Sequence, residues 1–116
     1  MTDLLNILFA LLSIGFGAVG WLAPRYTMEV LDTRDEGSTM GLSEVRAASG
    51  ALFVGLGLGA ILIGSPVAYA MIGCAWLGGA VGRATSLILD GVLRQKVVFF
   101  VVELIVGVLA IWINLA

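Results

Sequence analysis

Four long stretches of apolar residues fill most of the chain, at residues 4–23, 43–64, 67–89 and 97–115. Each holds roughly the 20 residues that an α-helix needs to cross a bilayer. The last stretch begins with a strand-like run, Val97 to Val102, but an open strand in lipid would leave its backbone polar groups unpaired. The pattern therefore predicts an all-α membrane protein, a four-transmembrane-helix bundle that forms one domain over residues 1–116.

Proline, glycine and serine mark the ends of the predicted helices. Pro24 ends the first helix, because proline lacks the amide donor that a continuing helix needs. Ser43 is the predicted N-cap of the second helix. A tight turn at Gly64-Ser65-Pro66 precedes the third helix, and Asp90-Gly91 opens the connection to the fourth. We expect the helix that starts at Leu4 to be retained, since no basic region precedes it as in a signal peptide.

Residues 24–42 form the one substantial polar segment of the sequence. Within it, Tyr26 to Leu31 are predicted to form a short interfacial helix with Met28 and Leu31 facing lipid, and residues 32–41 a loop. Trp21 and Tyr26 lie where an aromatic belt is expected.

The distribution of basic residues predicts the orientation in the membrane. Four helices place both termini and the turn at residues 64–66 on one face, and the two other connections on the opposite face. By the positive-inside rule, the face richer in lysine and arginine lies in the cytoplasm. We therefore expect a multi-pass protein of the bacterial inner membrane with both termini outside the cytoplasm. The basic residues on the cytoplasmic side are Arg25, Arg34, Arg94 and Lys96, with Arg46 nearby.

Composition narrows the candidate functions. Only 12% of the residues are charged and 60% are hydrophobic, whereas a soluble domain has about 25% charged residues. The net charge of −2 and the lack of a basic patch argue against a nucleic-acid partner. The chain has no histidine, which removes the commonest proton shuttle and metal ligand. The single cysteine, Cys74, lies in an apolar run and is predicted to be a packing residue. We expect no metal and no cofactor.

Small residues recur at four-residue spacing in the second and third helices. This spacing lets helix backbones approach closely. The rows either pack within the bundle, or one of them faces outward and binds a partner subunit. The predicted helix-packing residues are Ala51, Gly55, Gly59, Gly78 and Gly82.

Two motif matches fail on structural context. Gly15 to Gly20 match the dinucleotide fingerprint G-x-G-x-x-G, but that fingerprint needs a strand before it and a helix after it. Asp32 to Gly37 resemble the start of a calcium loop, but position three is Arg34 and the twelfth position is Ser43, where glutamate is required.

The most informative residues are charges at or within the apolar stretches: Glu44, Arg46, Arg83, Asp90 and Glu103. Arg83 and Glu103 both lie roughly 10 Å from the cytoplasmic end of their predicted helices. Ionisable groups in lipid are costly unless paired or hydrated, so an Arg83–Glu103 ion pair is predicted. Glu44 or Asp90 are candidates to share Arg83, and Arg46 to share Glu103.

This charged cluster leaves several functions open. It is either an ion-pair network that fixes helix register, or a polar cavity that binds a small ligand, an ion or a lipid headgroup. A transporter or proton-coupled carrier using Glu103 and Arg83 is the alternative from another class. A further alternative is a membrane enzyme acting on a lipid-soluble substrate by acid–base chemistry.

Short motifs in the cluster carry a family resemblance. Ser43-Glu44-Val45-Arg46, Gly82-Arg83, Leu89-Asp90-Gly91 and Glu103 resemble the DUF4345 family of small four-helix bacterial membrane proteins, which are loosely similar to DoxX-like proteins. The sequence departs from that family at Ser49-Gly50, where a Gly-Gly pair is usual. The resemblance implies the architecture and supplies no reaction.

The sequence thus favours a non-enzymatic accessory or scaffold protein, or a small-ligand-binding protein, with no catalytic residue assigned. Its expected partners are the lipid bilayer and a larger membrane complex or further copies of the chain.

Overall fold

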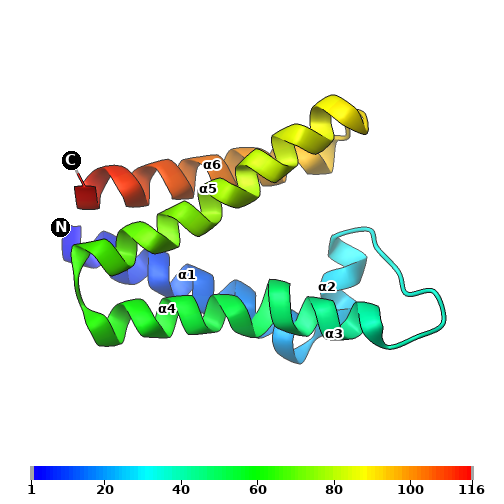
Figure 1. Cartoon of the computed structure of the whole chain (residues 1–116), viewed down its shortest axis with the longest axis horizontal. Helices are drawn as coiled ribbons and strands as arrows, with labels where there is room; N and C mark the ends of the chain where they lie inside the picture. Colours follow the sequence, from blue (N-terminus) through cyan, green and yellow to red (C-terminus); the bar gives the residue numbers. More distant parts are fainter. Residues whose placement is uncertain (1, 116) are drawn as a thin grey trace. The chain divides into compact units, whose positions relative to one another are not determined.

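The chain folds into helices, as the apolar pattern predicts. The computed structural model describes residues 2–115, and within that range it contains helices and connecting turns but no strand. Four helical segments are long and apolar enough to span a membrane, namely Asp3–Leu22, Met40–Ile63, Pro66–Leu89 and Arg94–Leu115. The predicted fold class, an all-α protein with four such helices, is therefore confirmed. In chain order the elements are α1 (Thr2–Leu22), α2 (Pro24–Val30), α3 (Met40–Arg46), the π-helical turn η1 (Ala47–Ala51), α4 (Leu52–Ile63), α5 (Pro66–Leu89) and α6 (Arg94–Leu115) (Figure 1).

The helices belong to two compact units. The first unit combines the start of α1, up to Phe9, with the chain from Ile63 onward. Its main feature is the antiparallel hairpin of α5 and α6 (Figure 1). Glycine allows the two helices to touch. A β-carbon added at Gly73 would lie 2.9 Å from the carbonyl oxygen of Gly107, and one added at Gly107 would lie 2.8 Å from the backbone nitrogen of Leu77.

The second unit, Ala10–Leu62, contains the rest of α1, the helices α2 and α3, η1 and nearly all of α4. Its closest contact lies where α1 meets η1. A β-carbon added at Gly50 would lie 2.6 Å from the backbone nitrogen of Trp21, and one at Gly20 would collide with the carbonyl oxygen of Ser49. Gly50 also has non-helical dihedral angles, φ −125° and ψ −105°. Inserted π-helical turns of this kind are often found at functional sites.

This packing explains the failed dinucleotide motif. Gly15 to Gly20 lie in the middle of α1, with no strand before them. Gly17 and Gly20 are three residues apart and therefore share one face of the helix. Both face η1 at distances that admit no β-carbon, whereas a β-carbon at Gly15 would meet no atom within 4 Å. Gly17 and Gly20 therefore serve helix packing.

Two spanning helices begin earlier than the apolar stretches suggest. The second begins at Met40, with Thr39 at the N-cap position, so Ser43 is not the N-cap. The amide of Ser43 already donates to the carbonyl of Thr39 at 3.0 Å. The fourth begins at Arg94, because polar side chains at a helix end remain in contact with water and do not stop the helix. At the start of α5, by contrast, Ser65 is the N-cap, and its hydroxyl accepts a bond from the amide of Ala68.

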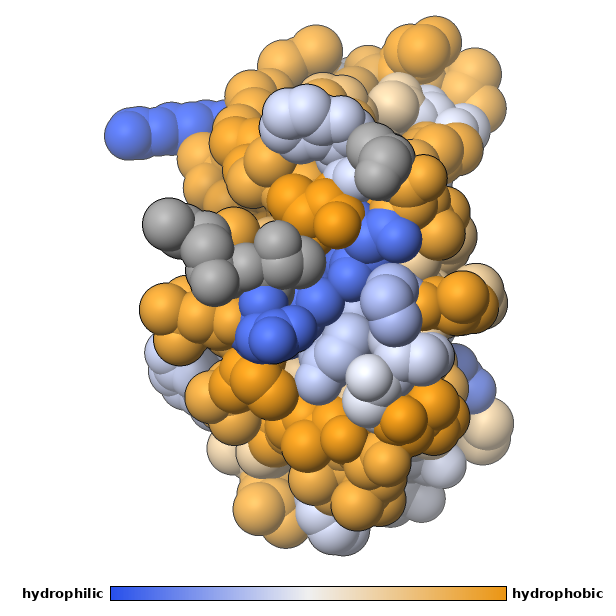
Figure 2. Space-filling model, turned by 90° about the vertical axis from the view of Figure 1, so that its left-hand side faces the viewer, coloured by the Kyte–Doolittle hydropathy of each residue, from blue (hydrophilic) through white to orange (hydrophobic). Residues whose placement is uncertain are grey.

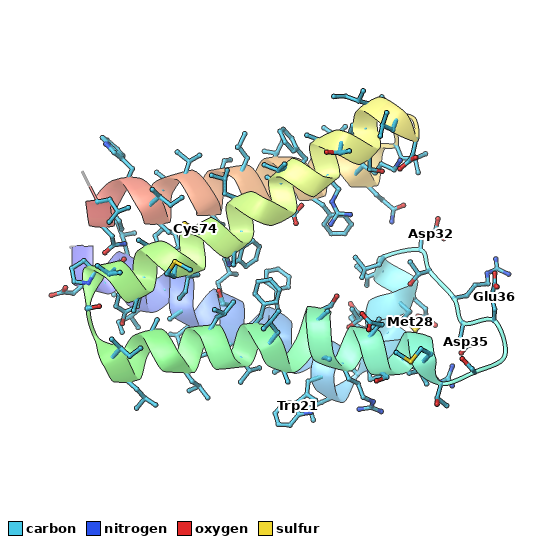
Figure 3. All side chains as sticks on the ribbon, viewed as in Figure 1. Trp21, Met28, Asp32, Asp35, Glu36 and Cys74 are labelled. Carbon is cyan, nitrogen blue, oxygen red and sulfur yellow. The ribbon has the colours of Figure 1, made fainter. Side chains whose placement is uncertain are left out.

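The polar segment between α1 and α3 contains a predicted short helix, α2. The orientation predicted for Met28 is wrong, however, because this side chain is buried and only 6% exposed. Its terminal methyl group approaches α3 at Gly41, where the absence of a side chain provides room (Figure 3). The loop that follows is tied back to α2 by an exposed ion pair between Arg25 and Asp35 at 3.4 Å.

The rows of small residues do not make the close contacts within their own units. A β-carbon added at Gly55, Gly59, Gly78 or Gly82 meets no atom within 4 Å. Ala51, the remaining predicted packing residue, lines a shallow pocket near the start of the second span. Hydrophobic residues cover most of the face seen in Figure 2, and hydrophilic residues lie near its centre and at its edges, as expected of helices whose side chains face lipid.

Candidate functional site

The α5–α6 hairpin holds the ion pair that the sequence predicts. Nε of Arg83 donates to Oε1 of Glu103 at 3.2 Å. The two side chains are 31% and 17% exposed, so the pair is partly buried. Arg83 lies about 9 Å from the end of α5 at Leu89, and Glu103 about 14 Å from the start of α6 at Arg94. The long arginine side chain spans this difference in depth.

An aromatic ring also contacts the arginine. The Cζ atom of Arg83 lies 5.1 Å from the centre of the Phe99 ring. Phe99 and Glu103 are four residues apart on α6, and such residues lie on the same face of a helix. One arginine therefore bonds to two successive turns of the neighbouring helix. A cation over an aromatic face within about 6 Å contributes about 0.5–2 kcal/mol, the larger value where water is excluded.

Gly79 provides the space for the glutamate. A β-carbon added at Gly79 would lie 2.6 Å from Oε2 of Glu103. Gly79 and Arg83 are one helical turn apart on α5, so the carboxylate lies between a bare stretch of backbone and a guanidinium group. The neighbouring Gly78 and Gly82 have open space instead. Gly79 is the glycine that shapes this site, and the signal for it in the sequence was a small residue one helical turn before Arg83.

The other three predicted members of the cluster have partners or positions of their own. Asp90 accepts a bond from the hydroxyl of Ser86 at 3.1 Å, at the end of α5. Arg46 donates from Nη1 to the carbonyl oxygen of Trp21 at 2.7 Å. Glu44 is exposed near the start of the second span. Glu44 and Arg46 belong to the second unit, whereas Arg83, Glu103 and Asp90 belong to the first.

A second polar contact in the first unit was not predicted. Nδ2 of Asn6 donates to Oδ1 of Asn114 at 2.8 Å, and Nδ2 of Asn114 returns a bond to Oδ1 of Asn6 at 2.7 Å. Asn114 also donates to the carbonyl of Ala110, and Asn6 is only 4% exposed. The sequence did carry a signal for this pair, since each asparagine is an isolated amide in an apolar stretch and the predicted topology places both at one membrane face.

This arrangement can hold charge and fix helix register. In the range 2–115, no group of three cysteine, aspartate or glutamate side chains has the geometry to hold a metal ion. Cys74 is exposed on α5 (Figure 3). Arg83 and Glu103 are engaged with each other, and Arg83 also with the ring of Phe99.

Four long apolar helices and an ion pair inside a helical hairpin define a small α-helical protein compatible with a multi-pass membrane protein. The chain belongs to the DUF4345 family, described as a domain of unknown function, whose family model matches residues 1–114. The predicted family is thus confirmed over essentially the whole chain. No curated protein and no solved structure matches the chain.

Proposed function

We propose that this chain is a non-enzymatic accessory or scaffold protein of the bacterial inner membrane, in which the Arg83–Glu103 pair holds α5 and α6 in register. One observation carries the proposal: both charges are engaged inside the hairpin, where Arg83 contacts Glu103 and Phe99. Helices in lipid gain little from hydrophobic association, so close packing and polar contacts must align them.

The alternative function, a carrier, would require Arg83 and Glu103 to separate during transport. A carrier that moves protons or ions through Glu103 would have to break its contact with Arg83 in every cycle. Breaking such a contact in a partly buried site leaves an uncompensated charge. The pair therefore supports a permanent structural role better than a cyclic one.

Reconstitution into vesicles separates the two classes. We expect purified protein to produce no proton or ion flux above that of empty vesicles, with or without a membrane potential. The matched variant is Glu103→Gln, which keeps the shape of the side chain and removes its charge. Flux that depends on Glu103 would refute the scaffold proposal. Native mass spectrometry from mild detergent supplies the positive arm, since a scaffold should be recovered with additional subunits at fixed stoichiometry.

The proposed orientation places the loop between α2 and α3 in the cytoplasm and both termini outside it. A cysteine introduced by Gly37→Cys, in a Cys74→Ala background, should react only with reagents that reach the cytoplasm. The background change is needed because Cys74 is itself exposed. If a membrane-impermeant reagent labelled this cysteine in intact cells, the loop would lie outside the cytoplasm and the proposed orientation would be refuted.

A further inference from the structure

The second unit contains a pocket that the Arg83–Glu103 pair does not involve. It is an open depression of about 560 Å³ where the end of α1, marked by the labelled Trp21 in Figure 3, meets the start of the second span. Its lining residues are Trp21, Thr39, Leu42, Ser43, Arg46, Ala47 and Ala51.

The lining has a polar end and an apolar end. Five of the lining residues are spaced three, one, three and one apart, which places them on one face of a helix: Thr39, Leu42, Ser43, Arg46 and Ala47. The hydroxyls and the guanidinium lie toward the start of this helix, at Thr39, Ser43 and Arg46. The alanines lie deeper in the apolar span.

Arg46 is fixed in place but is not neutralised. Its Nη1 bonds to the carbonyl of Trp21, one of the last carbonyls of α1, which have no partner within their own helix. In residues 2–115 the ion pairs are Arg25–Asp35 and Arg83–Glu103, so Arg46 takes part in neither. Glu44 is two residues away, and side chains at that spacing do not face each other on a helix.

The pocket lies near the start of the second span, Met40–Ile63, where the boundary between lipid headgroups and acyl chains is expected. Arg46 lies about 9 Å along the span that begins at Met40. Trp21, 45% exposed, closes the side of the pocket, and tryptophan is enriched at this level of a membrane. An arginine at this depth directs its charged group toward the interface.

We propose that this pocket binds the phosphate of an anionic membrane phospholipid, with Arg46, Ser43 and Thr39 as donors to the headgroup and Ala47 and Ala51 along the acyl chain. Arginine and hydroxyl donors suit phosphate oxygens. The row of small residues that includes Ala51 continues toward the end of the second span at Gly55 and Gly59, where a β-carbon would meet no atom within 4 Å. That smooth face gives an acyl chain a place to lie and favours a lipid over a free anion.

The test compares lipid retention and stabilisation among matched variants in mild detergent. Wild-type protein should retain phosphatidylglycerol in native mass spectra and gain thermal stability from it, and phosphatidylcholine should do neither to the same extent. Arg46→Gln should weaken phosphatidylglycerol binding about tenfold or more, because a hydrogen bond from a charged group is lost. The control Arg34→Gln removes an exposed charge from the loop and should leave binding unchanged.

Two further experiments, a second variant and a free-phosphate control, distinguish lipid binding from misfolding and from binding of a free anion. Ser43→Leu fills the pocket and leaves Arg46 bonded to Trp21, so it should abolish lipid retention even if Arg46→Gln does not fold. Inorganic phosphate at millimolar concentration should not reproduce the stabilisation. The proposal is overturned if phosphate matches the lipid, if both lipids bind equally, or if Ser43→Leu retains phosphatidylglycerol as the wild type does. None of these results depends on the scaffold role proposed for the hairpin.

Discussion

The Arg83–Glu103 pair should behave as one energetic unit. The perturbation is a double-mutant cycle with Arg83→Leu, Glu103→Leu and the double variant. Fully buried pairs lose about 3–5 kcal/mol when one partner is removed, and exposed pairs contribute about 0.2–1 kcal/mol. The observed pair lies between these limits, with a single hydrogen bond of 3.2 Å and side chains 31% and 17% exposed. We therefore expect each single change to cost about 2–3 kcal/mol of unfolding free energy.

The double variant should recover much of that loss, because no charge is then left unpaired. Its coupling energy should be on the order of 1–3 kcal/mol. Reversible unfolding in detergent, followed by circular dichroism, measures all four corners of the cycle. The control Arg94→Leu removes a charge from the exposed start of α6 and should change stability by less than about 0.5 kcal/mol. Additive single-variant losses would refute the reasoning, since they would mean that the two residues do not stabilise each other.

Three further predictions test other contacts in the first unit. Gly78→Ala should stabilise α5 by about 0.5–1 kcal/mol, because alanine favours a helix more than glycine does. Gly79→Ala should not show this gain, because its β-carbon would displace the Glu103 carboxylate. Equal melting temperatures for these two adjacent variants would contradict the site geometry. Gly107→Ala should destabilise the hairpin by about 1–3 kcal/mol, because its β-carbon meets backbone atoms; unchanged unfolding in detergent would contradict this. Asn6→Leu and Asn114→Leu should show a coupling of about 0.6–1.7 kcal/mol in a double-mutant cycle. Zero coupling would show that the two amides do not stabilise each other.

The sequence predicts the helices and the ion pair well, because both follow from the cost of polar groups in lipid. A stretch of about 20 apolar residues has few alternatives to a spanning helix. Arg83 and Glu103 have opposite charge on consecutive helices joined by a short connection, so their pairing relieves a cost that each would carry alone. The hydrogen bond between them confirms this prediction directly.

The helix contacts made by glycine could not be predicted in the same way. Glycine is abundant, and a four-residue spacing is satisfied by several faces of the same helix. The row at Gly55 and Gly59 fits the expected pattern but has open space, whereas Gly50 and Gly57 make the close contacts in the second unit. The π-helical turn at Gly50 contributes to this difference, because an extra residue in a helical turn shifts the register of everything after it. Periodicity read from an ideal helix does not include that shift.

A single stripe along α6 decides how the first unit fits together. Glu103, Gly107, Ala110 and Asn114 follow one another at spacings of four, three and four, so they share one face. Each makes a different contact: an ion pair, a close backbone approach, a fully buried methyl group and an amide pair.

Large apolar side chains do not determine which face of α6 contacts the neighbouring helices. They surround α6, which has the highest mean hydropathy of the four spans, 2.5, and lipid accepts them as readily as a neighbouring helix does. The contacting face is therefore selected by the residues that lipid accepts poorly and by those small enough to let backbones meet. In a chain this apolar, the polar residues and the small residues that contact a neighbouring helix carry most of the structural information, and they are also the residues at which a binding site has to be sought.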